Sequence, residues 1–134
     1  MSPATPLLVF LPRRPMAGCH KAPAPAPQTD RALLVEQRKD AAISQLADCE
    51  SGQGGGDSRY VGRLQFEPRT VINYVKERDG RTLSTQEAVA IASDYGQASS
   101  LAKYMIFERD AHAQWPACSR KIGLARQVAE IKAL

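Results

Sequence analysis

Residues 43–52 read ISQLADCESG, a run with helical spacing that stops at a glycine. Its apolar positions follow the pattern i, i+3, i+4 from Ile43, and Glu50 continues the same stripe at i+7. The pattern predicts a helix in which Glu50 emerges at the end of the buried face. Gly52 and the glycines at 54–56 end this helix and open a flexible loop.

The same helix extends back to Thr29 or Asp30, either of which can cap its first turn. Leu34 and Val35 continue its apolar side towards this end. Downstream, the segment 60–66 is too short for a helix and is expected to be extended.

Capping and breaking residues predict two helices in the middle of the chain. Pro68 suits the first turn of one helix, which Gly80 ends. Ser84 and Glu87 form a capping box for the next helix, which Gly96 is expected to stop.

Two more helices are predicted over 97–109 and 124–131, and residues 115–118 are expected to interrupt the helical pattern between them. The sequence has no internal repeats. The predicted fold class is therefore mainly α, and at most α+β with little sheet.

Seven of the nine prolines lie in the first 29 residues. They include the Ala-Pro repeat at 22–27. Because proline fixes φ and removes an N–H donor, this repeat predicts an extended spacer. We therefore expect a disordered arm over 1–29 and one domain over 30–134. A domain of about 100 residues is only marginally stable, so a covalent cross-link would help it.

The arm carries two incomplete export signals. Residues 7–11 are apolar, but Arg13 and Arg14 follow them, whereas a secretory signal has its positive charge first. Residues 15–19 resemble the lipobox of bacterial lipoproteins, in which small residues precede a lipidated cysteine. Cys19 is thus a candidate for lipidation and membrane anchoring. No segment is long enough to span a bilayer as a helix.

The formal net charge is +4, with acidic and basic residues interspersed. This charge suits an anionic partner, which could be a nucleic acid, a membrane or a cell wall; alternatively, it serves only solubility. No Lys/Arg run singles out nucleic acid, so no nucleic-acid partner is expected. His20 and His112 do not define a metal site with the cysteines. No cofactor is expected either.

Cys49 and Cys118 both lie within the predicted domain, and Cys19 lies in the arm. Outside the cytoplasm, three cysteines are expected to form one disulfide bond and to leave one cysteine unpaired. A bond between Cys49 and Cys118 would close a loop of roughly 70 residues and contribute about 4 kcal/mol. The alternative is three reduced thiols in a cytosolic protein.

Glu50 is the candidate for acid chemistry. A carboxyl on an apolar stripe is partly desolvated, which raises its pKa, and the negative end of the helix dipole acts in the same direction. A carboxyl that is protonated near neutral pH can donate a proton to a leaving oxygen, as glycosidases require. The alternative is a glutamate that turns into solvent at a helix end.

Three motifs in order strengthen the first interpretation: Cys49-Glu50-Ser51-Gly52, then YVGRLQF at 60–66, then Trp-Pro-Ala-Cys at 115–118. Together they resemble the lysozyme-like lytic transglycosylases, and most closely the resuscitation-promoting-factor branch. The resemblance covers about residues 41–123. It implies a compact lysozyme-like domain that cleaves the β-1,4 bond between N-acetylmuramic acid and N-acetylglucosamine in peptidoglycan.

The resemblance also implies roles for single residues. Glu50 would protonate the glycosidic oxygen and then act as the base for attack by the muramyl C6 hydroxyl, which leaves a 1,6-anhydro end. Cys49 would pair with Cys118. The implied substrate-binding residues are Ser51 beside the acid, Gly62 where the backbone approaches the sugar, Gln65 in the cleft, and the stacking candidates Tyr60, Tyr104 and Trp115, for which core packing is an equal explanation.

The sequence departs from the family pattern at Arg63, where a small residue is usual, and in the short glycine-rich gap that follows Glu50. These departures favour a rival hypothesis, a catalytically weak or inactive peptidoglycan-binding module of the same fold. A basic nucleic-acid-binding helical protein ranks last, because it leaves the cysteines and Glu50 without a purpose.

A second carboxylate would favour lysozyme-type hydrolysis with retention. Asp57 lies in the glycine-rich loop and Glu67 precedes a helix, so neither is convincing, and the single-acid transglycosylase mechanism is preferred. Compartment and partner follow from this hypothesis: an extracytoplasmic monomer, secreted, periplasmic or envelope-associated, that acts on glycan strands.

Overall fold

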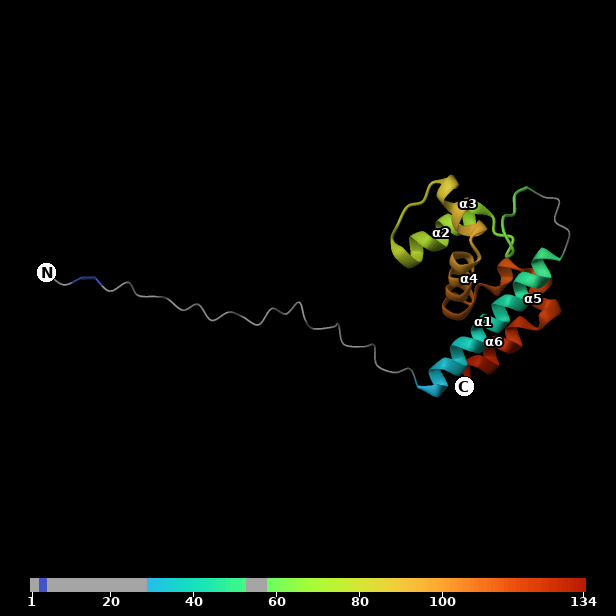
Figure 1. Ribbon diagram of the computed structural model, residues 1–134. Coiled ribbons are helices and arrows are strands. Elements are labelled where there is room, and N and C mark those ends of the chain that lie inside the picture. Colours follow the sequence, from blue (N-terminus) through green and yellow to red (C-terminus); the bar gives the residue numbers. More distant parts are fainter. Residues whose placement is uncertain (1–2, 5–28, 53–57) are drawn as a thin grey trace.

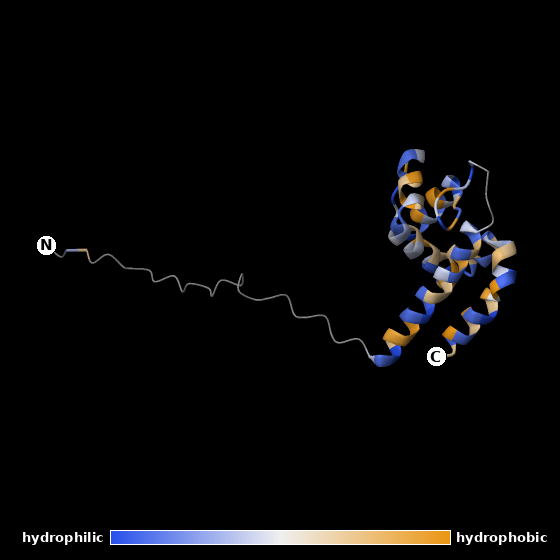
Figure 2. Cartoon of the chain, turned by 45° about the vertical axis from the view of Figure 1, so that its right-hand side comes forward, coloured by the Kyte–Doolittle hydropathy of each residue, from blue (hydrophilic) through white to orange (hydrophobic). Residues whose placement is uncertain are grey.

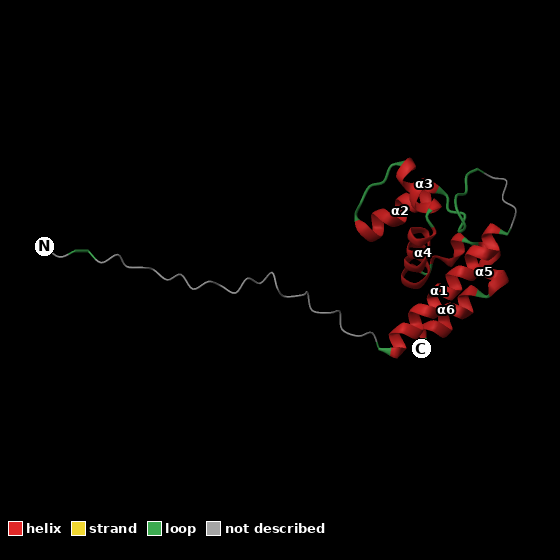
Figure 3. Cartoon of the chain, in the orientation of Figure 1, coloured by secondary structure: helices red, strands yellow, loops and turns green. Residues whose placement is uncertain are grey.

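The computed structural model describes residues 3–4, 29–52 and 58–134, and this part of the chain is mainly α-helical, as predicted. Figure 3 shows helices joined by loops. Within the described residues the β-structure is limited to one isolated antiparallel bridge, between Val61 and Phe66. Most of the predicted arm, including the lipidation candidate Cys19, lies outside the described residues, and so do the glycines at 54–56.

The first helix, α1 (Asp30–Ser51), begins where the sequence predicts. Thr29 caps it, since the Thr29 Oγ1 accepts a hydrogen bond of 3.2 Å from the N–H of Ala32. The buried face begins only at Ala42. Leu34, expected on the apolar side, is 39% exposed, because the first turns of α1 reach beyond the densely packed part of the core.

In the part of the chain that the structure describes, seven further helical elements follow α1. They are α2 (Pro68–Asp79), α3 (Thr85–Ser93), α4 (Tyr95–Lys103), the π-helical turn η2 (Tyr104–Glu108), the 3₁₀ turn η3 (Ala111–Gln114), α5 (Pro116–Ile122) and α6 (Leu124–Lys132). Helix α1 contacts α4, α5 and α6, while α2 packs on α3, which in turn contacts α4. Figure 1 shows α6 running beside α1, so that the C-terminus lies near the start of α1.

The core gathers side chains from nearly every element. Its largest fully buried members are Ile43, Leu46, Leu64, Val71, Val75, Leu101, Met105, Ile106, Cys118 and Leu124. Hydrophobic and hydrophilic residues alternate along α1 and α6 in Figure 2, as expected of amphipathic helices. Helix α6 buries Leu124, Val128 and Ile131, so it is part of the core.

One expected break in the helical pattern is wrong, and a second is shorter than expected. Gly96 does not stop a helix; it is the second residue of α4. Asp94 separates α3 from α4, because its side chain accepts a 3.0 Å hydrogen bond from the N–H of Gln97 and so caps the new helix. The break expected over 115–118 is confined to Trp115, which has non-helical backbone angles (φ −125°, ψ 66°). Pro116 is already the first residue of α5, a position where its missing N–H costs nothing.

The segment 60–66 is a tight turn and not an extended strand. Two backbone hydrogen bonds, of 2.9 and 3.0 Å, join Val61 and Phe66 across it. Gly62 and Gln65 both have positive φ, 75° and 50°, which reverses the chain between them. Leu64 and Phe66 are therefore buried from a turn and not from the extended segment that was expected.

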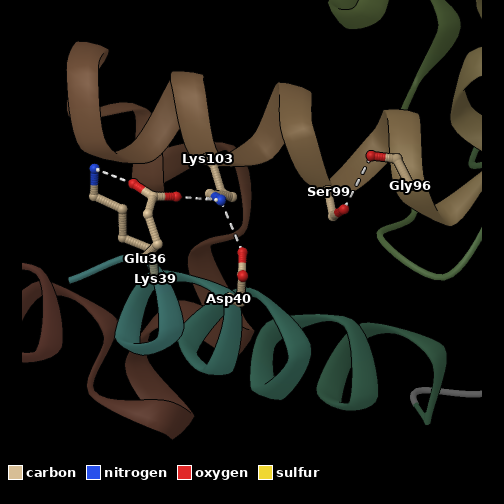
Figure 4. A network of polar contacts seen from close by, with 6 residues as sticks. All are labelled: Glu36, Lys39, Asp40, Gly96, Ser99 and Lys103. Carbon is tan, nitrogen blue, oxygen red and sulfur yellow. Dashed lines mark hydrogen bonds and ion pairs between the residues drawn. The ribbon is translucent and has the colours of Figure 1, made fainter. Parts of the chain in front are cut away.

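Lys103 joins α4 to α1 through two carboxylates. Its Nζ lies 2.8 Å from Glu36 Oε2 and 2.8 Å from Asp40 Oδ1 (Figure 4). The hydrogen bond from Lys103 is the main cause that lowers the pKa of Glu36. These side chains are partly exposed, so each pair contributes less than about 1 kcal/mol to stability.

Candidate active site

Glu50 lies one residue before the end of α1, and its side chain is partly buried. This burial raises the pKa of Glu50, and the positive charge of Lys121 on α5 acts in the opposite direction. The effect of burial exceeds that of Lys121, so the pKa of Glu50 is raised overall and the carboxyl holds its proton more tightly than a free glutamate does. Such a group can act as a general acid closer to neutral pH.

A disulfide bond joins Cys49 to Cys118, as predicted, and fixes the end of α1 against α5. The two Cα atoms are 5.8 Å apart. Lys121 follows Cys118 by one helical turn, which explains why its charge reaches Glu50. Lys121 was not predicted as a neighbour of Glu50, although its spacing from Cys118 places it near Glu50 once the Cys49–Cys118 bridge is assumed.

A small cavity of about 110 Å³ lies between the 60–66 turn, the start of α2 and the end of η3. Three predicted substrate-binding residues, Tyr60, Gln65 and Trp115, meet there. The other lining residues, none of which was predicted to bind substrate, are Phe66, Glu67, Thr70 and Gln114. Glu50 is not among the residues that line this cavity.

Gln65 is held by its own turn. Its Nε2 donates a 2.7 Å hydrogen bond to the carbonyl oxygen of Gly62. Because this bond uses the amide group, the side-chain oxygen of Gln65 is directed away from the turn, and within the described residues it accepts no hydrogen bond. Gln65 therefore presents an acceptor suited to a hydroxyl or amide of a ligand.

Tyr60 and Trp115 differ in exposure. Tyr60 is 44% exposed and can offer a ring face to a sugar. Trp115 is 3% exposed, contacts Phe66 edge-on at 5.4 Å between ring centroids, and donates its indole N–H to Leu64. Core packing therefore accounts for Trp115, and little of its ring is left for stacking on a sugar.

Gly62 is required for packing. A Cβ at this position would lie 2.0 Å from the carbonyl oxygen of Ala92 at the end of α3. Real Cβ atoms do not approach an oxygen so closely, so any larger residue would separate the turn from α3. The close contact with Ala92 is therefore enough to explain why residue 62 is a glycine, and no approach of the backbone to a sugar is needed to account for it.

Ser51 and Tyr104 lie outside the cavity around Gln65. Ser51 is the exposed last residue of α1, and its hydroxyl donates a weak 3.4 Å hydrogen bond to the carbonyl oxygen of Asp48. Tyr104 donates its hydroxyl to Glu77 at 2.9 Å and lines a different cavity, together with Lys103. The structure therefore does not bring Tyr104 together with Tyr60 and Gln65.

Arg63 is held between two helices. Its guanidinium lies 2.7 Å from Asp48 Oδ1 on α1 and 4.3 Å from the ring centre of Tyr95 on α4. These contacts hold the Arg63 cation near the end of α1, the helix that carries Glu50. Arg63 is not among the causes of the raised pKa of Glu50. Arg63 stood out in the sequence as a departure from the family pattern, but its partners Asp48 and Tyr95 were not predicted.

Within residues 3–4, 29–52 and 58–134, no three His, Cys, Asp or Glu side chains gather in a way that could hold a metal ion. In the same residues no helix has the length and apolar character needed to cross a membrane. Comparisons with protein-family models, with curated proteins and with solved structures find no match to this chain.

Proposed function

We propose that this chain is a peptidoglycan-cleaving glycosidase in which Glu50 is the acid and base of a lytic transglycosylation. The observation that carries the proposal is the partly buried Glu50 carboxyl, whose pKa is raised by burial at a helix end that a disulfide bond holds in place. General acid catalysis needs both features, a proton retained near working pH and a fixed direction for its transfer.

The proposed reaction needs only one carboxyl group. Protonated Glu50 donates its proton to the glycosidic oxygen between N-acetylmuramic acid and N-acetylglucosamine. The resulting carboxylate then accepts the proton of the muramyl C6 hydroxyl as that oxygen attacks the anomeric carbon. The bond to the leaving sugar breaks, a 1,6-anhydro ring forms, and Glu50 regains its proton.

The cavity around Gln65 supports a role in glycan binding. It combines an exposed ring, Tyr60, with the free side-chain oxygen of Gln65 and the hydroxyl of Thr70. Rings and hydrogen-bonding groups in one concave site suit a carbohydrate, which has apolar faces and a rim of hydroxyls. A wall substrate also implies an extracytoplasmic location, which agrees with the presence of a disulfide bond.

One observation favours a second candidate function, a peptidoglycan-binding module without turnover. Glu50 is not part of the cavity that Tyr60 and Gln65 line, so binding and acid chemistry are not joined in one described cavity. Such a module would bind glycan strands through Tyr60 and Gln65 and leave them uncut.

Digestion of purified cell wall tests both candidates. The wild type, Glu50→Gln and the matched control Glu108→Gln, an exposed carboxyl far along the chain, are incubated with the wall, and the products are identified by mass spectrometry. We expect 1,6-anhydro-muropeptides from the wild type and the control, and a loss of about 10²–10⁴-fold in Glu50→Gln. Reducing-end products would mean hydrolysis, and bound but uncut wall would mean the binding module.

A further inference from the structure

Another cavity, of about 610 Å³, lies at the corner between η3, α5 and α6. One part of its lining is apolar and small, with Ala113, Pro116 and Ala125. The other part carries basic side chains, Arg120 and Arg126, beside the partly buried His112. Small apolar walls with cations at one side suit a ligand that has methyl groups and carboxylates.

The backbone around this cavity is held by hydrogen bonds. The hydroxyl of Ser119, which is buried, donates a 2.8 Å bond to the carbonyl oxygen of His112 and so fixes η3 on α5. Gly123 makes the corner between α5 and α6 with a φ of 63°. Gln127 donates to the carbonyl oxygen of Ile122 at 2.8 Å across the same corner. The cavity is therefore a preformed feature of the fold.

The two arginines are not neutralised by strong ion pairs. Arg126 approaches Glu130 only at 4.0 Å, and both side chains are well exposed, so that pair is weak. Arg120 forms no ion pair with any residue in the described part of the chain. The guanidinium of Arg126 lies at the corner, since its Nη2 would be 3.8 Å from a Cβ placed on Gly123. Both cations are available to an anionic group.

The two cavities share one wall. Gln114 and Trp115 line the cavity around Gln65, and the neighbouring His112, Ala113 and Pro116 line the cavity with the arginines. A ligand bound in the cavity around Gln65 therefore needs to extend only across η3 to enter the cavity with the arginines. A branched substrate meets that condition.

We propose that the cavity between η3, α5 and α6 binds the short peptide stems that branch from the glycan strand. The stem carries carboxylates for Arg120 and Arg126, and alanine methyl groups for the wall made by Ala113, Pro116 and Ala125. Guanidinium groups bind carboxylates with charge-assisted hydrogen bonds, which fixes orientation as well as charge. This inference rests on the proposed peptidoglycan substrate and adds the part of the substrate that the η3 side recognises.

Binding of a soluble stem peptide tests the inference without any cleavage. A synthetic tetrapeptide stem with free carboxylates is titrated into isotope-labelled full-length Glu50→Gln protein, and amide shifts are followed by NMR. We expect the shifts to gather at residues 112–126. In an added Arg120→Gln, Arg126→Gln background the dissociation constant rises about tenfold. The matched control Arg31→Gln, Arg38→Gln removes the same charge from exposed positions on α1 and leaves the dissociation constant unchanged.

A second measurement separates this inference from the proposed cleavage. Wild-type protein digests intact wall and glycan stripped of its stems by an amidase. Faster cleavage of intact wall, lost in the Arg120, Arg126 double variant, supports stem recognition. If the stem binds but no wall is cut, the stem site stands and the proposed glycosidase fails. If wall is cut but the stem causes no shifts at 112–126, or both double variants bind it equally, the stem site is overturned.

Discussion

The indole N–H of Trp115 donates a 2.8 Å hydrogen bond to the carbonyl oxygen of Leu64, 51 residues away in the sequence. Both residues are buried, and the bond fixes the 60–66 turn against the start of α5. Because Cys118 follows on the same helix and is bonded to Cys49, one short segment holds both the turn and the end of α1.

Replacing Trp115 tests whether this residue stabilises the fold. Trp115→Phe leaves the Leu64 carbonyl oxygen without its donor, and a buried acceptor without a partner costs about 1–3 kcal/mol. We expect the free energy of unfolding in urea to fall by about that amount. As a comparison, Tyr60→Ala at an exposed position should change stability by less than about 0.5 kcal/mol while weakening glycan binding. Unchanged stability in Trp115→Phe would contradict the packing role.

Two glycines with similar backbone angles give a matched test of the contact at Gly62. Gly62→Ala and Gly80→Ala both place a side chain at positive φ, 75° and 70°. A Cβ at 62 meets the Ala92 carbonyl oxygen, whereas a Cβ at 80 has nothing within 4 Å. We expect Gly80→Ala to cost about 1 kcal/mol and Gly62→Ala about 1–3 kcal/mol more, measured by thermal unfolding. Equal costs would show that the turn can move away from α3.

The Cys49–Cys118 bond joins residues 69 apart in the sequence, so it restricts the unfolded chain strongly. In the chain-entropy model its removal costs about 4 kcal/mol. We expect the Cys49→Ser, Cys118→Ser double variant, or reduction by dithiothreitol, to lower the free energy of unfolding by about that amount and to lower the unfolding midpoint accordingly. Cys19→Ser is the control, and its midpoint should match that of the wild type; a drop there would indicate that Cys19 takes part in the cross-link.

Glu50 gives a prediction for pH. Because burial raises its folded pKa above the ordinary value of 4.5, its contribution to stability is fully present below that value and is lost as pH rises through the folded pKa. Glu50→Gln carries no titrating proton. Its stability relative to the wild type should therefore increase from about pH 4.5 upward and then level off. Urea unfolding at several pH values measures this difference, and a difference that stays constant would show an unshifted carboxyl.

The same shift predicts the pH profile of wall cleavage. The proposed acid must be protonated, so kcat/KM should fall as pH rises above the folded pKa of Glu50. Lys121→Gln removes the charge that opposes the shift, so the pKa of Glu50 should rise further and the falling limb should move to higher pH. Rates of anhydro-muropeptide release between pH 4 and 9 measure this falling limb in the wild type and in Lys121→Gln. A limb that does not move would exclude Lys121 as a neighbour of the acid.

Local signals predicted much of the helical architecture. The cap at Thr29, the capping box at Ser84 and the proline at 68 each act within one turn, so their effect can be read from neighbouring residues. The error at Gly96 and the overestimated length of the break at 115–118 have the same origin. Glycine and proline both break helices in general, and only the hydrogen bonds of their neighbours show whether they lie inside a helix or start one.

The candidate site likewise has a part that the sequence predicts and a part that only the tertiary structure shows. The spacing of the apolar residues before Glu50 is enough to place its carboxyl at the end of a buried stripe, since helical periodicity is a local property. What Gly62, Arg63 and Trp115 contact could not be read from the chain, because their partners Ala92, Asp48 and Leu64 lie 15 to 51 residues away. Contacts over such distances form only when the helices pack. Tertiary structure alone therefore assigned Trp115 to the core and held Arg63 against α1.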